Sequence, residues 1–319
     1  MSRKRKAIVT GATGGVSINL MLDLLAHGYE VTAVPRPDSP RAALIPQHPS
    51  LTVVPCDLTG YAGLPAQLAH DYDMFFHLAW AGPFGEERND LRLQLRNVQS
   101  ALDAVDAAHA LGCGVFVGAG SQAEYGVVRE KLRPDMPCLP TTGYGTAKLA
   151  ASVLTRIRCG QLGLRQNWCR VLSLYGPYDG MHTGVMTLIR AFLSGERPRC
   201  TPGDQVWDYV YAGDVAQAFR LAAENGRDGA IYCVGSGETR TLRRYIEAIR
   251  DAVDPALPIG FGEIPYYPNQ AMHLEADISA LCKDTGYQPQ YSFERGIRAT
   301  VEWVRSQNDI GGKQQDGTR

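Results

Sequence analysis

Short apolar runs alternate with longer amphipathic segments through the first two thirds of the chain. The runs predict buried strands, because parallel strands covered on both faces read as nearly continuous apolar stretches. The longer segments predict helices, and in the first of them Ile18, Met21, Leu22 and Leu25 share one stripe. The expected strands are residues 7–10, 30–34, 51–55, 74–79, 114–118 and 167–174, and the expected helices are 16–27, 89–111 and 144–162.

This alternation predicts the fold class. A strand, a helix and another strand repeated in this way give an α/β fold with a doubly wound parallel sheet and right-handed crossovers. In such sheets ligands bind at the carboxyl ends of the strands. Residues that directly follow the predicted strands are therefore the first candidates for a binding site.

The pattern changes after Tyr175, where the turn-rich stretch 176–180 begins. We predict a first domain over residues 1–174, which a returning segment at about 208–237 completes. Residues 175–207 and 238–305 then form a second, smaller region. The polar and glycine-rich residues 306–319 predict a flexible tail.

Composition and charge exclude several classes of function. The chain of 319 residues has 32 Lys and Arg against 33 Asp and Glu, a net charge of −1, so nothing favours binding to nucleic acid or to an anionic membrane. No apolar run predicts a signal peptide or a transmembrane helix. The eight cysteines are scattered without a CxxC pair and the histidines lack metal-ligand spacing, which predicts reduced thiols in a cytoplasmic protein and no metal site.

A glycine-rich turn follows the first predicted strand. In the stretch Thr10-Gly11-Ala12-Thr13-Gly14-Gly15, the residues expected at a cofactor are Gly11, Thr13, Gly14 and Gly15. Such a turn lets the backbone approach a pyrophosphate, whose charge the amides at the helix N-terminus hold. An ordinary tight turn is the alternative, but the position between a strand and a helix favours dinucleotide binding.

The end of the second strand bears on which dinucleotide is bound. An acidic side chain there would bind the ribose 2′-hydroxyl of NAD, whereas this chain has Arg36 where a 2′-phosphate would lie, and Ser39 could add a hydroxyl. We therefore expect NADP, with NAD possible if Arg36 is merely solvated and Asp38 serves the ribose.

The next two strand ends offer further cofactor contacts. Asp57 and Leu58 follow the third strand, where Asp57 is either an adenine contact or a plain helix N-cap. Leu78 and Ala79, at the end of the fourth strand, would present their backbone to the cofactor. Trp80 follows them and either lines the substrate cavity or is a core aromatic residue.

Tyr144 and Lys148 predict the chemistry. They are four residues apart and therefore share one helix face. A tyrosine with a pKa of about 10 is a poor base at neutral pH, and a nearby ammonium favours its phenolate. Ser121, which follows the fifth strand, would hold the reacting oxygen beside Tyr144. An isolated Tyr-x-x-x-Lys is usually a surface contact, but together with the glycine-rich turn it predicts hydride transfer at an oxygen-bearing carbon.

These motifs, in this order, resemble the extended short-chain dehydrogenase/reductase family, in its nucleotide-sugar epimerase, dehydratase and reductase branch. The resemblance covers residue 6 to about 303 and implies a Rossmann-like fold, with Ser121, Tyr144 and Lys148 as the catalytic residues. It also implies a nucleoside-diphosphate sugar in the C-terminal region and a homodimer formed by helices at about 89–111 and 145–162. Its landmarks are Thr10 to Gly15, Asp57-Leu58, His77-Leu78-Ala79, Asn97-Val98, Ser121, Tyr125-Gly126, Tyr144, Lys148, Arg170, Tyr175-Gly176-Pro177, Asp208 to Tyr211, Asp214 and Val234 to Glu238.

Departures from the family pattern reduce the number of reactions that the resemblance implies. The family's 4,6-dehydratases have an Asp-Glu pair after the serine or threonine, whereas this chain has Gln122 and Ala123. Many epimerases have Arg where this chain has Trp207 and Asn where it has Ser173. The diphosphate contacts must then come from elsewhere, and the candidates are Arg190, Arg197 and Arg199.

The segments 120–126 and 207–209 are similar to those of reductases that act on nucleoside-diphosphate 4-keto-6-deoxysugars. We therefore expect NADPH-dependent reduction of a 4-keto nucleoside-diphosphate sugar. An NAD-dependent nucleotide-sugar 4-epimerase is the alternative, and a non-catalytic relative that binds cofactor is a third possibility. The candidate sugar contacts are Trp80, Gln122, Glu124, Ser173 and Trp207.

Overall fold

The computed structural model describes residues 3–267 and 270–315 of the chain. Its centre is a seven-stranded sheet in the order β10-β6-β5-β4-β1-β2-β3, in which every neighbouring pair is parallel. The strands are β1 (Lys6–Thr10), β2 (Glu30–Val34), β3 (Leu51–Val53), β4 (Met74–His77), β5 (Val115–Ser121), β6 (Arg165–Val171) and β10 (Ala230–Val234). The predicted fold class, a doubly wound parallel α/β sheet, is confirmed.

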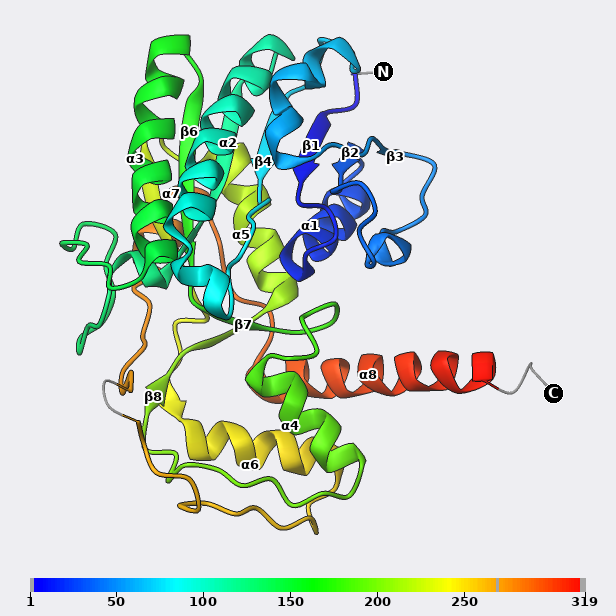
Figure 1. Ribbon diagram of the computed structural model, residues 1–319, viewed down its shortest axis with the longest axis vertical. Coiled ribbons are helices and arrows are strands. Elements are labelled where there is room, and N and C mark those ends of the chain that lie inside the picture. Colours follow the sequence, from blue (N-terminus) through cyan, green and yellow to red (C-terminus); the bar gives the residue numbers. More distant parts are fainter. Residues whose placement is uncertain (1–2, 268–269, 316–319) are drawn as a thin grey trace.

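Helices cover both faces of this sheet (Figure 1). On one face lie α1 (Gly15–Ala26), α5 (Ala212–Asn225) and α7 (Ser279–Thr285). On the other face α2 (Leu91–Ala110) and α3 (Gly143–Leu162) run side by side. Short 3-10 turns connect several elements: η1 (Ala42–Leu44), η2 (Leu58–Ala66), η3 (Glu86–Asn89) and η4 (Gln122–Glu124).

The alternation of side chains along β1 divides the core in two. Ala7 and Val9 pack with α1 and α5, whereas Ile8 packs on the opposite face with Ala104 and Val105 of α2. All three strand residues are fully buried, as expected where helices cover both faces of a parallel sheet. The apolar strand runs of the sequence are thus explained by burial on two sides.

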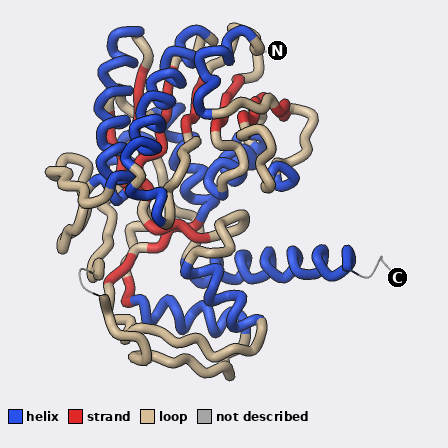
Figure 2. The backbone as a smooth tube through the Cα atoms, in the orientation of Figure 1, coloured by secondary structure: helices blue, strands red, loops and turns tan. Residues whose placement is uncertain are grey.

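Other parts of the C-terminal half build a separate group of elements below the sheet, which Figure 2 shows as helices joined by long loops. Two short strand pairs, β7 (Ser173–Tyr175) with β9 (Tyr209–Tyr211) and β8 (Val206–Trp207) with β11 (Arg240–Thr241), lead into it. Its helices are α4 (Gly184–Leu193), α6 (Leu242–Val253) and α8 (Phe293–Gln315), and they share one apolar cluster.

Helix α8 continues to Gln315 and so includes residues 306–315 of the predicted tail, whose flexibility stays a prediction. Its first turns are anchored by the buried Ile297, Val301 and Val304. Residues 316–319 of the predicted tail lie outside the described residues. None of the described helices is long and apolar enough to cross a membrane.

A buried arginine ties α1 to α5 and provides a test of this fold. Arg220, 7% exposed, donates to Asp23 at 2.6 Å and to Glu224 at 3.0 Å. Arg220→Met removes the cation from both carboxylates. Because they are partly solvated and Glu224 keeps the hydroxyl of Tyr29 as a donor, we expect a loss of about 1–3 kcal/mol in unfolding free energy. Urea denaturation measures it.

The control is Arg244→Met, because Arg244 is 73% exposed and pairs with Glu247 three residues away. An exposed pair of this kind contributes at most about 0.5 kcal/mol. Equal stability losses in the two variants would show that the contacts of Arg220 do not stabilise the packing of α1 on α5.

Candidate active site

A cavity of about 880 Å³ opens at the carboxyl ends of β1, β4 and β5. Most of the residues proposed from the sequence line it, although they come from segments far apart in the chain. The lining includes Gly11, Thr13, Gly14, Gly15, Arg36, Asp57, Leu58, Leu78, Ala79, Trp80, Ser121, Gln122, Tyr144, Lys148 and Ser173. The sheet topology therefore produces one site from these motifs.

The glycine-rich turn fits a dinucleotide. At Gly11, whose φ is +65°, an added Cβ would lie 2.7 Å from the backbone of Ala79, so only glycine fits there. Helix α1 begins after Gly14, at which the described residues place no side-chain cap. The first amides of α1 are thus free to bind an anion at the cavity wall, as a pyrophosphate requires.

Two guanidinium groups stand at the far end of the cavity, next to this turn. Arg36 and Arg41 both line it, and Arg41 donates through Nε to the carbonyl of Thr13 at 3.0 Å and through Nη2 to the carbonyl of Tyr178. Ser39 donates its hydroxyl to Oγ1 of Thr13 at 3.2 Å. Arg41 was not predicted from the sequence, because it follows Arg36 by five residues in a loop without a recognisable motif.

Asp57, after β3, was predicted to be either a helix N-cap or an adenine contact. Asp57 caps η2 by accepting the amide of Thr59 at 3.1 Å, and it also lines the cavity beside Leu58. Asp57 therefore is a helix N-cap that also lines the cavity, so its capping role does not exclude a contact with the adenine.

Ser121 is placed by the turn that follows β5. It is the N-cap of η4, and its hydroxyl oxygen accepts the amide of Ala123 at 3.2 Å. The first turn of α3 packs directly on η4, because a Cβ on Gly145 would collide with the carbonyl of Ala123. Gly145 thus lets the helix approach closely enough to bring Tyr144 to Ser121.

Burial dominates the protonation of the tyrosine and lysine. It raises the pKa of Tyr144, although the hydroxyl of Ser121 and the guanidinium of Arg88 oppose this rise. Burial also lowers the pKa of Lys148 to about 7, against the nearby charge of Glu124. We expected Lys148 to favour the phenolate, but in this structure the pKa of Tyr144 stays above its usual value, because burial outweighs the Ser121 hydroxyl and the Arg88 guanidinium.

Arg88 and Trp80 complete the surroundings of Tyr144. The guanidinium of Arg88 lies 4.5 Å from the centre of the Tyr144 ring, and the ammonium of Lys148 lies 5.9 Å from it. The Lys148 ammonium is closer to the Trp80 ring, at 3.7 Å, and donates to the carbonyl of Ala119 at 2.7 Å. Trp80 lines the cavity and donates to Gln94 at 2.9 Å, so it is a wall residue.

Two predicted sugar contacts are not among the residues that line the cavity. Glu124 is fully buried and accepts hydrogen bonds from Trp168 and Arg170, since it points behind η4 into the protein. Trp207 lies behind Ser173, to whose hydroxyl oxygen its indole donates at 2.7 Å. The full burial of Glu124 contradicts its predicted direct contact, whereas contact by the partly buried Trp207 stays a prediction. Ser173 and Gln122 line the cavity.

The arginines proposed for the diphosphate are also elsewhere. Arg197 and Arg199 both pair with Glu263 on the surface, and Arg190 is exposed on α4.

The cavity lining also includes residues that were not predicted from the sequence, among them Asp179 and His182 from the loop before α4. Burial raises the pKa of Asp179, although Thr183 and the amide of Gly180 donate hydrogen bonds to it. No cluster of three or more metal-ligating side chains occurs among the described residues.

Comparisons with known proteins agree with this geometry. A dTDP-glucose 4,6-dehydratase of Xanthomonas campestris pv. campestris is 29% identical over 59% of this chain, and the match spans only 57% of that relative. A dTDP-4-dehydro-6-deoxyglucose reductase of Escherichia coli is 26% identical over 74% of this chain and 76% of its own.

Among solved structures, the UDP-N-acetylglucosamine 4-epimerase of Methanobrevibacter ruminantium M1 superposes with a TM-score of 0.86 and 26% identity, over 96% of this chain and all of the other. Residues 7–235 match the NAD dependent epimerase/dehydratase family. The three relatives named here are enzymes of nucleotide sugars. The chain therefore belongs to this family of extended short-chain dehydrogenase/reductase enzymes.

Proposed function

We propose that this enzyme reduces the 4-keto group of a nucleoside-diphosphate sugar with NADPH. The main support is the single cavity that has Ser121, Tyr144 and Lys148 at one end and the guanidinium groups of Arg36 and Arg41 at the other. These are the groups needed for carbonyl reduction and for a dinucleotide with an additional phosphate.

Each residue has a definite task in this mechanism. The hydroxyl oxygen of Ser121 already accepts the Ala123 amide, so its proton is available to donate to the substrate carbonyl oxygen. Tyr144 delivers a proton to the alkoxide oxygen as it forms, and the guanidinium of Arg88, together with Lys148 in its protonated form, stabilises the phenolate that remains. A dinucleotide held by the glycine-rich turn would supply the hydride. Ser173, whose oxygen accepts the Trp207 indole, can donate to a sugar hydroxyl.

The residues after Ser121 argue against dehydration. Loss of water from the sugar needs an acid and a base beside it, and here a neutral amide, Gln122, faces the cavity while Ala123 has only a methyl group. This difference supports a reductase or an epimerase, despite the similarity to a dehydratase.

The choice of cofactor rests on the adenosine end of the cavity. Arg36, Ser39 and Arg41 line it, whereas Asp38 is exposed and is not part of the lining. A site with two cations and a hydroxyl favours a 2′-phosphate over a 2′-hydroxyl. NAD remains the alternative, because the family description names it.

A nucleotide-sugar 4-epimerase is the second candidate function. It is supported by the similarity of the whole chain to a solved 4-epimerase, and it would use the same Ser121, Tyr144 and Lys148. An epimerase oxidises and re-reduces one sugar, so it retains its cofactor. Mass spectrometry of ligands released from the purified protein therefore distinguishes the two functions, since stoichiometric NAD without NADPH turnover supports the epimerase.

We also propose a homodimer formed by α2 and α3, and a cytoplasmic location suggested by the scattered cysteines. Both helices expose large apolar side chains, among them Leu91 and Leu95 of α2 and Ile157 of α3, which are 65%, 68% and 52% exposed. Such an apolar surface is typical of a protein interface.

Removing the phenol tests the mechanism. Tyr144→Phe keeps the ring and its contact with Arg88 but cannot supply the proton. We expect kcat for NADPH-dependent reduction of a 4-keto nucleotide sugar to fall by about 10²–10⁴-fold. NADPH binding, measured by fluorescence titration, should remain. A variant as active as the wild type would contradict both enzymatic proposals.

Arginine substitution tests the cofactor proposal. Arg36→Ala removes one cation from the expected 2′-phosphate site, which should cost about 1.5–3 kcal/mol, or at least about tenfold in the Kd of NADPH. The Kd of NADH should not change, because NADH lacks this phosphate. Equal affinities for both dinucleotides in both proteins would overturn the assignment to NADP.

A charge placed on α3 tests the dimer. Ile157→Glu puts a carboxylate into the proposed apolar interface, so light scattering coupled to size exclusion should show a monomer where the wild type is a dimer. The matched control is Ile264→Glu, which changes an exposed isoleucine outside both helices and should leave the dimer intact. A monomeric wild type would contradict the proposal.

A further inference from the structure

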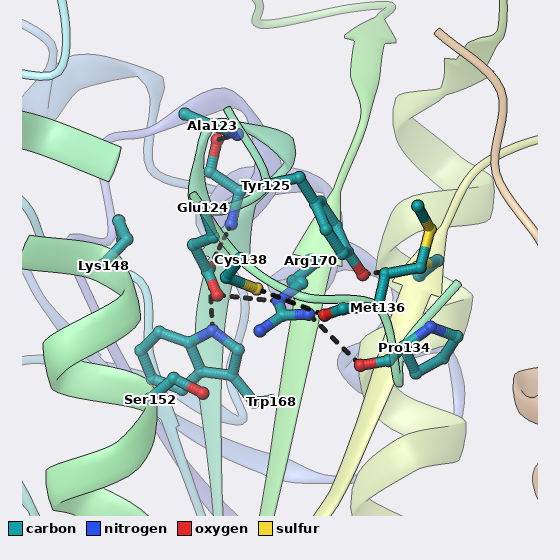
Figure 3. Close-up of polar contacts among 12 residues, drawn as sticks. Ala123, Glu124, Tyr125, Pro134, Met136, Cys138, Lys148, Ser152, Trp168 and Arg170 are labelled. Atoms are coloured by element: carbon teal, nitrogen blue, oxygen red, sulfur yellow. Dashed lines mark hydrogen bonds and ion pairs between the residues drawn. The ribbon is translucent and has the colours of Figure 1, made fainter. Parts of the chain in front are cut away.

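Three buried polar side chains lie directly behind the catalytic pocket, and the mechanism above does not use them. Glu124, Trp168 and Arg170 are each at most 2% exposed. Figure 3 shows the Trp168 indole beside α3 and the Arg170 guanidinium beside Tyr125. A buried ion pair by itself is weak evidence for stability, because desolvation offsets its attraction. Its position next to Ser121 points to another role.

Glu124 uses both carboxylate oxygens. Its Oε1 accepts the backbone amide of Ser121 at 2.8 Å and the indole N–H of Trp168 at 2.9 Å. Its Oε2 accepts from Nε of Arg170 at 2.7 Å. The carboxylate is thus fixed from the β6 side by two donors, and its contact with Ser121 reaches the residue that touches the substrate.

The hydrogen bond from the Ser121 amide to Glu124 completes a capping box at the start of η4. Glu124 holds the Ser121 amide, while the Ser121 hydroxyl oxygen accepts the amide of Ala123. With one acceptor position of the hydroxyl used in this way, its proton is directed away from η4. The turn therefore determines in which direction Ser121 can donate a hydrogen bond.

We propose that Glu124, held by Arg170 and Trp168, is a positioning residue that orients the Ser121 hydroxyl toward the substrate carbonyl. The inference rests on the proposed function, in which Ser121 is a catalytic residue. In this role Glu124 acts through Ser121 and not by contact with the substrate, because it is fully buried and does not line the cavity. Its charge also acts on Tyr144 and Lys148, and both double variants described below remove that charge.

The surrounding chain accommodates this cluster. A Cβ on Gly120 would collide with the Trp168 indole and lie 2.6 Å from Oε1 of Glu124, so glycine in β5 leaves room for both. Arg170 stays charged: burial favours the neutral guanidinium, but the charge of Glu124 outweighs it and the pKa of Arg170 is raised. Arg170 also donates to the carbonyl of Pro134 at 3.3 Å, which anchors the loop after η4.

Two double variants separate positioning from the ion pair. Both E124Q/R170M and E124L/R170M remove the pair without leaving a buried charge. They differ in that the introduced glutamine retains an oxygen that accepts the amide of Ser121, whereas the introduced leucine has no acceptor. We expect kcat of E124Q/R170M to exceed that of E124L/R170M at least tenfold, with similar KM and similar Kd for NADPH. Equal kcat values per folded protein would overturn the proposal.

Coupling to Ser121 gives a readout that a purely structural role would not change. We expect Ser121→Ala to reduce kcat at least tenfold less in the E124L/R170M background than in the wild type, because the hydroxyl is already misdirected there. Equal reductions in both backgrounds would mean that Glu124 does not act through Ser121. Arg220→Met controls for general loss of stability and should keep the full effect of Ser121→Ala.

Amide hydrogen exchange distinguishes failure of this inference from failure of the proposed function. A wild-type enzyme inactive as a reductase and as an epimerase would refute the function. Exchange of the segment 118–126 would still report whether Glu124 holds the turn. We expect faster exchange at Ser121 in E124L/R170M than in E124Q/R170M, and equal rates would overturn the positioning role.

Discussion

The close approach of α3 to the turn after β5 is the constraint on which the site depends. Gly145 gives the helix no side chain at the contact with the Ala123 carbonyl, so the first turn of α3 rests directly on η4. Because Tyr144 precedes this glycine and Ser121 begins η4, the same contact brings the two hydroxyl groups together. A larger residue at position 145 would separate them, even if every catalytic side chain were retained.

The electrostatics of the site follow from the same burial. A helix packed this tightly excludes water, which penalises both the phenolate of Tyr144 and the ammonium of Lys148. Burial therefore favours the neutral forms of both side chains, the phenol of Tyr144 and the amine of Lys148. Arg88, from the segment after β4, contributes a further positive charge near the phenol.

The sequence predicted most of the sheet and the glycine-rich turn that lines the cavity, because these depend on local pattern. Strand β2 was predicted with its observed bounds, and most other predicted elements agree within a few residues. The positions of Arg41, Arg88 and Asp179 could not be predicted, since each is brought to the cavity by loop conformation. Glu124 was misplaced for a related reason: its distance in sequence from Ser121 does not show on which side of η4 it points.

Arg41 links the glycine-rich turn after β1 to the loop that leads to α4. Its guanidinium donates to the carbonyl of Thr13 in the glycine-rich turn and to the carbonyl of Tyr178 in that loop. An attempt to switch the coenzyme preference of this enzyme by replacing Arg41 would therefore also release that loop. Coenzyme engineering should start from Arg36, which is exposed and lines the cavity.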